Sequence, residues 1–316
     1  MSGCLLSVIV PVKDEEQSIA RFVERVTAVL DGAAATGTSA FEILFIDDGS
    51  SDCTLAAIIA ANRLDPRIRA LSFSRNFGKE AALSAGIDHA RGDCVIPMDV
   101  DLQDPPEVIP EMIAKWREGF DIVYGVRDNR KSDSLPKRLT AGLYYRAHNM
   151  LSDDKIPEHA GDFRLLDRKA VDVIRSMPER NRFMKGLFAW AGFRQTSVNY
   201  TRPPRETGST KFGYWKLWTF ALDGITSAST VPLRVWSYLG GIVALFALAY
   251  ALVVVVRTLA FGVQVPGYAS LMVAVLFLGG LQLLSLGVLG EYVGRILIEA
   301  KARPLYVIRD KVGDRD

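Results

Sequence analysis

Two long uncharged stretches near the C-terminal end constrain this chain more than any other feature. Residues 236–256 and 268–290 contain 21 and 23 residues without a charged side chain. At about 1.5 Å per residue, a helix of either length can cross a hydrocarbon layer of roughly 30 Å. A buried helical hairpin in a soluble fold is the alternative, but such a hairpin does not need this length without a single charge. We therefore predict two transmembrane helices within residues 234–300.

The basic residues that flank these stretches predict their orientation. Arg234 precedes the first stretch, Arg295, Lys301 and Arg303 follow the second, and the short connector holds only Arg257. Because basic residues are retained on the cytoplasmic side of a membrane, both ends of the hairpin are expected in the cytoplasm. The chain is thus predicted to be a multi-pass membrane protein with its larger N-terminal part in the cytoplasm.

Composition narrows the possible partners. Hydrophobic residues make up 49% of the 316 residues, and the mean hydropathy is +0.14, an excess concentrated in the C-terminal stretches. The 38 basic and 36 acidic residues give a net charge of +2, so no nucleic acid partner is expected.

The three cysteines lack metal-ligand spacing and suit a reducing compartment. The apolar residues 5–12 lack a basic leader and run into charged residues, which favours a strand over a signal peptide.

The first 125 residues alternate between β-rich apolar runs and helical patterns. The predicted strands cover residues 6–12, 41–46, 68–73, 93–98 and 121–124. The predicted helices cover residues 17–30, 54–62, 79–89 and 106–118. This alternation is typical of an α/β fold with a mostly parallel sheet, right-handed crossovers and helices on both faces.

Acidic clusters follow three of the predicted strands. They lie at residues 14–16, 47–48 and 99–104. Ligands of open parallel sheets bind beyond the carboxyl ends of the strands, so the three clusters are expected at one edge. We interpret this edge as the functional site.

The cluster at residues 99–104 has the composition of a cation site. Asp99, Asp101 and Gln103 alternate, and in an extended segment alternate side chains point the same way. Two carboxylates and an amide oxygen suit a hard cation such as Mg²⁺ or Mn²⁺, and they leave positions for phosphate oxygens. The sequence therefore predicts a divalent metal at Asp99, Asp101 and Gln103.

Two further segments lie between the α/β region and the hairpin. Residues 126–160 are polar, basic and poorly periodic, which is typical of a long functional loop. Residues 215–229 alternate an aromatic and apolar face with polar residues, which suits a helix lying at a membrane interface.

Six ordered segments carry a resemblance to a known family. They are SVIVPVKDEE, IDDGSSDCT, SRNFGKEAALSAGI, DVDLQDPPE, GDFRLLDR and RETGSTKFG, beginning at residues 7, 46, 74, 99, 161 and 205. Together they resemble the family 2 glycosyltransferases of the polyisoprenyl-phosphate class, which includes dolichyl-phosphate mannose synthase and the bactoprenol glucosyltransferases of the GtrB type. The soluble resemblance covers roughly residues 5–215, and the two C-terminal stretches match the bactoprenol type.

The resemblance implies a GT-A fold and inverting transfer of a hexose from a nucleotide-sugar to a polyisoprenyl phosphate. UDP-glucose is the favoured donor, with GDP-mannose and UDP-formamido-arabinose as alternatives, and undecaprenyl phosphate is the expected acceptor. A homotetramer in the bacterial inner membrane is also implied. The resulting division is a catalytic domain at 1–213, an interfacial helix and linker at 214–233, a transmembrane hairpin at 234–300 and a cytoplasmic tail at 301–316.

By resemblance, several residues bind the donor. Asp47 and Asp48 match the acidic pair near base and ribose, although Asp47 also suits a turn cap. Lys79 is expected to meet the donor phosphates or only to begin a helix. Asp99, which shares the metal site with Asp101 and Gln103, could also touch the ribose. The positions that match the nucleoside site are Pro11, Lys13 and Glu15.

Basic residues are matched to the phosphate groups. Arg127, Lys137 and Arg138 match the segment that receives the lipid phosphate, although attraction to anionic headgroups is an alternative for the last two. A loop before the interfacial helix is expected to bind the diphosphate or the acceptor phosphate. Its residues are Arg205, Ser209 and Lys211.

Asp162 lies where the family is suspected to hold a catalytic carboxylate, and Asp101 is the second residue assigned to catalysis. A phosphate acceptor is already negatively charged, so a strong base is not required. Asp162 could instead orient the acceptor or pair with Arg164.

Three rival functions are weaker. A processive polysaccharide synthase is expected to need a QxxRW-type motif and more membrane spans, and neither is found in the sequence. A scaffold with a degenerate transferase domain fits poorly with the intact acidic and basic motifs. A nucleotidyltransferase would need a Gly- and Lys-rich signature near the N-terminus, which is not evident.

Overall fold

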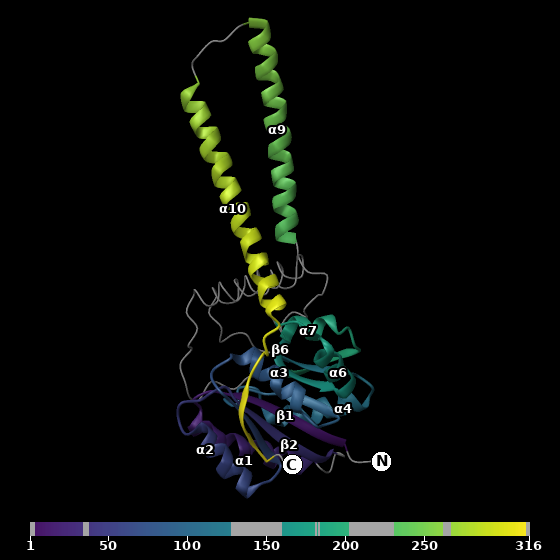
Figure 1. Ribbon diagram of the computed structural model, residues 1–316. Coiled ribbons are helices and arrows are strands. Elements are labelled where there is room, and N and C mark those ends of the chain that lie inside the picture. Colours follow the sequence, from purple (N-terminus) through teal and green to yellow (C-terminus); the bar gives the residue numbers. More distant parts are fainter. Residues whose placement is uncertain are drawn as a thin grey trace.

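The computed structural model describes residues 4–33, 38–127, 160–180, 182, 184–201, 231–261 and 267–313. These residues form a mixed sheet covered by helices on both faces, and a pair of long helices extends away from it (Figure 1). The α/β fold predicted from the sequence is therefore confirmed.

Within the described residues, eight strands form one sheet in the order β7-β5-β6-β4-β1-β2-β3-β8. Only β6 and β8 pair antiparallel with their neighbours, so the other six strands run in one direction. The strands are β1 (Cys4–Val12), β2 (Thr38–Asp47), β3 (Ile68–Phe73), β4 (Cys94–Pro97), β5 (Ile122–Arg127), β6 (Ala160–Asp167), β7 (Gln195–Tyr200) and β8 (Ile308–Val312).

Helices bury both faces of this sheet. One face packs against α1 (Glu16–Ala33), α2 (Thr54–Leu64) and α4 (Ile109–Arg117), which follows the 3₁₀ turn η2 (Pro106–Val108). The other face packs against α3 (Lys79–His89), α6 (Arg168–Ser176) and α7 (Met184–Trp190). Along β1, Val8 and Val10 belong to the first core and Ile9 to the second. A strand buried on both sides reads as a continuous apolar run, which is why β1 is visible in the sequence.

The helical hairpin consists of α9 (Val231–Phe261) and α10 (Tyr268–Lys301). Within the described residues, the stretch 277–301 of α10 is the one that meets the length and composition needed to cross a membrane. The apolar stretch found in α9, residues 238–247, is shorter. At its C-terminal end α10 contacts the α/β domain, because both carboxylate oxygens of Glu299 accept the backbone N–H of Arg180, at 2.9 and 3.0 Å.

After α10 the chain returns to the sheet, as the strand drawn in yellow shows (Figure 1). Residues 301–316, predicted only as a tail, contain β8, which pairs antiparallel with β3 at the sheet edge. Tyr306 anchors this return, since its ring stacks on Phe73 at 5.1 Å and its hydroxyl donates to Asp88 at 2.8 Å. The C-terminal segment is thus part of the α/β domain.

Several predictions lie outside the described residues. They are residues 214–230 of the predicted interfacial helix and linker, and the predicted phosphate-binding residues Lys137, Arg138, Arg205, Ser209 and Lys211. Residues 231–233 of that predicted segment begin α9.

Candidate active site

The carboxyl ends of β1, β2 and β4 meet at one edge of the sheet, as predicted. The loops that follow these strands carry Lys13 to Glu15, Asp48, and Asp99 to Asp101, and Asp47 is the last residue of β2. The start of α3 and the beginning of β6 add Lys79 and Asp162 to this edge. The side chains of the site therefore come from segments that are far apart in the sequence.

Asp48 locks two loops of the site together. Its carboxylate is buried and accepts backbone N–H groups from Phe77, at 2.6 Å, and Gly78, at 2.9 Å. Burial raises the pKa of Asp48 above its ordinary value, although the two N–H donors oppose this shift. The adjacent Gly49 has φ +62°, and a Cβ there would lie 2.5 Å from the carbonyl carbon of Arg75. Glycine is required because the two loops touch through their backbones.

Asp47 is almost fully buried beside it. One carboxylate oxygen accepts the N–H of Ser50 at 3.0 Å, which is the turn-capping bond considered from the sequence. The other accepts the hydroxyl of Ser72 on the neighbouring strand β3 at 2.7 Å. The side chain is therefore fixed from two directions, and turn capping accounts for only one of its contacts.

The turn after β1 packs on the same loop. Lys13 Nζ donates to the carbonyl oxygen of Gly49 at 3.3 Å. Asp14 has a left-handed backbone with φ 53°, a conformation that Asp and Asn tolerate better than other side chains. Its carboxylate accepts the N–H of Ser51, and this bond lowers the pKa of Asp14. Glu15 accepts the hydroxyl of Ser18 in the first turn of α1, so its carboxylate stabilises the helix start.

Lys79 joins two acidic residues from different strands. Its Nζ lies 2.7 Å from Oδ1 of Asp99 and 3.3 Å from Oδ2 of Asp162. Partial removal of water lowers the pKa of Lys79, but the two carboxylates outweigh this effect and hold the pKa above its ordinary value. The ammonium therefore remains charged and neutralises part of the acidic cluster. The pairing of Asp162 with Lys79 is not among the roles predicted for Asp162. Arg164, the partner predicted for Asp162 as one alternative, also lies over the ring of Phe188 at 4.3 Å.

The segment after β4 is a turn and not an extended chain. Leu102 has a left-handed φ of 54°, and the N–H of Gln103 donates to Oδ1 of Asp101 at 3.1 Å. The prediction that Asp99, Asp101 and Gln103 alternate along an extended segment is therefore wrong. The physical reason is that Asp101 accepts a bond from the backbone two residues on, which closes a local turn. Gln103 is buried, whereas Asp99 is 37% exposed.

Within the described residues, no group of three or more His, Cys, Asp and Glu side chains is arranged to hold a metal. Asp99 and Asp101 still offer two carboxylates at the exposed edge, and Asp99 already binds a positive charge through Lys79. Two carboxylates fit a cation that takes its remaining ligands from phosphate and water. The donor set thus fits a divalent ion bound together with a phosphorylated ligand.

Arg127 belongs to a second cluster that the sequence reveals only in part. Its Nε donates to the hydroxyl of Tyr200 at 3.2 Å, and its Nη2 lies 3.8 Å from Asp104. The Tyr200 hydroxyl donates to Asp104, and burial together with this carboxylate raises the pKa of Tyr200. Asp104 was visible in the acidic cluster, but Tyr200 lies on β7, which has no signal in the sequence strong enough to predict it. The cluster holds Arg127 at the end of β5.

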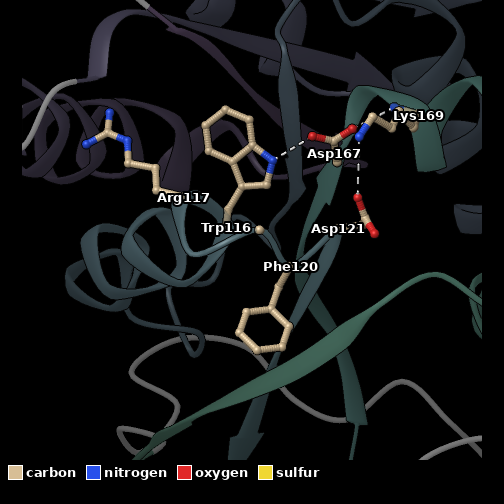
Figure 2. A pocket seen from close by; sticks show the side chains of 7 residues that line it. Trp116, Arg117, Phe120, Asp121, Asp167 and Lys169 are labelled. Atoms are coloured by element: carbon tan, nitrogen blue, oxygen red, sulfur yellow. Dashed lines mark hydrogen bonds and ion pairs between the residues drawn. The ribbon is translucent and has the colours of Figure 1, made fainter.

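The described structure also contains a pocket of about 220 Å³ that lies away from these residues. Figure 2 shows Trp116 and Asp167 joined by a hydrogen bond of 2.7 Å, and Lys169 facing Asp121 at 3.8 Å. Asp121 directly precedes the amino end of β5, and Asp167 is the last residue of the antiparallel strand β6. The pocket is therefore at the opposite edge of the sheet from the acidic site, and its charged groups largely satisfy one another.

Comparison with known proteins identifies the family. The model of glycosyl transferase family 2 matches residues 7–175, which contain the acidic loops, Lys79 and Asp162. The chain belongs to glycosyl transferase family 2. A second model, the GtrB C-terminal hairpin, matches residues 231–296 and thus most of α9 and α10. The resemblance noted from the sequence motifs is confirmed, and the chain is a glycosyltransferase.

Relatives match this glycosyltransferase along nearly its whole length. A glycosyltransferase of Synechocystis is 53% identical, covering 98% of this chain and 96% of its own. A prophage bactoprenol glucosyl transferase homolog of Escherichia coli is 50% identical, covering 96% and 98%. The bactoprenol glucosyl transferase of Shigella phage SfV is 50% identical, covering 97% and 98%.

Proposed function

We propose that this glycosyltransferase moves a glucosyl group from UDP-glucose to a polyisoprenyl phosphate, most simply undecaprenyl phosphate. The observation that carries the proposal is identity of about half over at least 96% of the chain to proteins named bactoprenol glucosyl transferase. Such identity covers both the α/β domain and the hairpin. GDP-mannose and UDP-formamido-arabinose are the alternative donors.

In this proposal the nucleoside binds over the loops after β1 and β2. Asp47 and Asp48 are held rigidly by hydrogen bonds from β3 and from the loop before α3. Rigid carboxylates suit hydroxyl and N–H donors of a ribose and a base, because little side-chain freedom is lost on binding. The other members of the nucleoside site are Pro11, Lys13 and Glu15.

Asp99 and Asp101 would hold Mg²⁺ or Mn²⁺. Gln103 is the least suited of the three predicted metal ligands because its side chain is buried. A divalent ion bound there would neutralise charge that develops on the leaving diphosphate. Lys79 would stay near Asp99 and turn its ammonium toward the same phosphates. A second positive charge at this point favours departure of the nucleoside diphosphate.

The proposed reaction is one displacement with inversion. A phosphate oxygen of the acceptor forms the new bond to the anomeric carbon, and the bond from that carbon to the diphosphate oxygen breaks. The electron pair leaves with the nucleoside diphosphate, so no proton has to be removed from the acceptor. Asp162 therefore acts by holding Lys79 in place rather than as an obligatory base.

The hairpin would bring the water-insoluble acceptor to this site. α9 and α10 expose many large apolar side chains, including Leu245, Phe246, Leu283 and Leu284, each at least 62% exposed. An apolar surface of this kind is suited to lipid or to other copies of the hairpin. We propose that both helices cross a bacterial inner membrane, that the α/β domain is cytoplasmic, and that the chain forms a homotetramer.

Arg127 would lie on the acceptor side of the site. Its guanidinium is fixed by Tyr200 and Asp104, and a fixed fork suits a phosphate group. Together with Arg127, the residues proposed to bind the acceptor phosphate or the diphosphate are Lys137, Arg138, Arg205, Ser209 and Lys211.

The test is transfer of radiolabelled sugar into an organic-extractable, acid-labile lipid. Purified protein receives undecaprenyl phosphate, Mg²⁺ or Mn²⁺, and UDP-glucose or GDP-mannose in parallel, with EDTA as the control. Metal-dependent label from UDP-glucose is expected. If only GDP-mannose labels the lipid, GDP-mannose replaces UDP-glucose as the proposed donor. If the label enters a water-soluble polymer, the proposed function is replaced by that of a polysaccharide synthase.

A further inference from the structure

The C-terminal strand β8 contains an irregularity opposite the carboxyl end of β3, the strand that lies beside β2. In its pairing with β3, Ser72 lies opposite Asp310, whereas Phe73 lies opposite Ile308. Arg309 is therefore the extra residue of a β-bulge. Bulges redirect side chains and are frequent beside active sites. The bulge is thus a feature that could direct Arg309 toward a particular partner.

That partner is Ser72. Nη2 of Arg309 donates to Oγ of Ser72 at 3.2 Å, and the Ser72 hydroxyl donates to Oδ2 of Asp47 at 2.7 Å. A hydroxyl has one proton to donate and can accept at the same time, so the three groups form a directed chain. Ser72 and Asp47 are 0% and 1% exposed, whereas the side chain of Arg309 is 51% exposed.

The direction of these bonds has a consequence for Asp47. A guanidinium that donates to Ser72 polarises its hydroxyl and strengthens the bond that this hydroxyl donates to Asp47. Because the Ser72 hydroxyl is also held by Arg309, it has less freedom to rotate away from the carboxylate. Asp47 is then held in one orientation at the carboxyl end of β2.

We propose that Arg309 is a positioning residue for donor binding, which acts through Ser72 on Asp47. The inference rests on the proposed function, because Asp47 is there assigned to the nucleoside. It links the segment that follows the membrane hairpin to the donor half of the site. Arg309 itself is not expected to touch the sugar or the phosphates.

The experiment compares Arg309→Ala with Lys311→Ala in the full-length protein. Lys311 lies on the same strand opposite Leu71, so its replacement removes the same charge away from Ser72. Binding of UDP, and of GDP in parallel, is measured by calorimetry, and KM and kcat are measured with UDP-glucose. For Arg309→Ala we expect a nucleotide Kd and a KM raised about three- to tenfold, with kcat within about twofold of the wild type.

Lys311→Ala is expected to bind nucleotide like the wild type, and Arg309→Lys to recover part of the affinity. If Arg309→Ala lowers the Tm, Arg309→Gln, which retains most of the side chain, replaces it in the comparison. Unchanged nucleotide binding in the Arg309 variants would overturn the inference. If Lys311→Ala loses as much nucleotide affinity as Arg309→Ala, the inference is also overturned, since removal of a positive charge from β8 would then explain the loss.

Asp47→Asn separates this inference from the proposed function. If Asp47→Asn weakens nucleotide binding but Arg309→Ala does not, only the role of Arg309 is overturned. If Asp47→Asn leaves nucleotide binding unchanged, the donor assignment of Asp47 fails and the inference fails with it. The chain of hydrogen bonds is supported if both single variants weaken nucleotide binding and the double variant Asp47→Asn/Arg309→Ala binds nucleotide no more weakly than Asp47→Asn alone.

Discussion

Nζ of Lys79 lies 2.7 Å from Oδ1 of Asp99, although Lys79 begins helix α3 and Asp99 follows strand β4. The same ammonium reaches Asp162 on β6 at 3.3 Å. One positive charge therefore holds two carboxylates that would otherwise repel each other. In the proposed function this charge is available to the diphosphate when the donor binds.

Replacing Lys79 is expected to disable transfer without unfolding the protein. Lys79→Gln removes the charge shared by Asp99 and Asp162, and we expect the rate of lipid glucosylation to fall about 100-fold. Lys169→Gln is the matched control, because this ammonium is 75% exposed at the opposite edge of the sheet. Equal rates for Lys79→Gln and wild type would show that the charge has no role in transfer.

Asp101→Asn is expected to lower transfer at least about 100-fold, because an amide is a poorer ligand for a hard cation than a carboxylate. Mn²⁺ binding in the presence of UDP should weaken in parallel. The circular dichroism spectrum is expected to stay unchanged, since the Asn side chain can still accept the N–H of Gln103. A normal rate in Asp101→Asn would remove the metal assignment.

Gly49→Ala is expected to disturb both the fold and donor binding. Its Cβ would approach the carbonyl carbon of Arg75 to 2.5 Å at a φ of +62°, so the loops joined by Asp48 must separate. Thermal unfolding should shift to lower temperature and UDP binding should weaken. Gly32→Ala is the control, because its Cβ meets nothing within 4 Å and Ala favours the helix α1 by up to about 1 kcal/mol.

A buried ion pair away from the site provides a stability prediction. Nη1 of Arg69 lies 2.6 Å from Oε2 of Glu42, and both side chains are at most 7% exposed. Glu42→Leu leaves the guanidinium buried without its carboxylate, which is expected to cost about 3–5 kcal/mol. The double variant Glu42→Leu/Arg69→Leu should recover much of that loss in chemical denaturation. Asp31→Ala, which affects an exposed pair with Arg67, should cost less than about 1 kcal/mol.

Asp65 gives a pH dependence with a defined sign. Hydrogen bonds from Arg67 lower the pKa of Asp65 below its ordinary value of 3.8. The folded state thus binds the proton more weakly, so the contribution of Asp65 is present above about pH 4 and is lost as pH falls through the folded pKa. The Tm of Asp65→Asn should be lower than that of the wild type at pH 7, and the difference should shrink below pH 3.8. A constant difference across this range would contradict the prediction.

The sequence alone determined the central α/β layer, the family and the edge at which the acidic groups gather. The predicted strand at 68–73 and helix at 79–89 have the bounds found for β3 and α3. Such elements are visible because strands buried on both faces are continuously apolar, and because α/β topology brings the carboxyl ends of parallel strands together. The long apolar hairpin is visible for a similar reason, since its pattern needs no tertiary context.

Only the tertiary structure decided which side chains meet at the site. Strand β8 has the sequence IRDKV, in which three of five residues are charged, and it becomes a strand because the edge of β3 supplies its hydrogen bonds. The contacts of Lys79 with Asp162, and of Arg309 with Ser72, join residues 83 and 237 positions apart. The turn at Leu102 likewise depends on one local hydrogen bond that a periodic pattern does not encode. Periodicity determines which elements form, whereas pairing and packing determine which of their side chains come into contact.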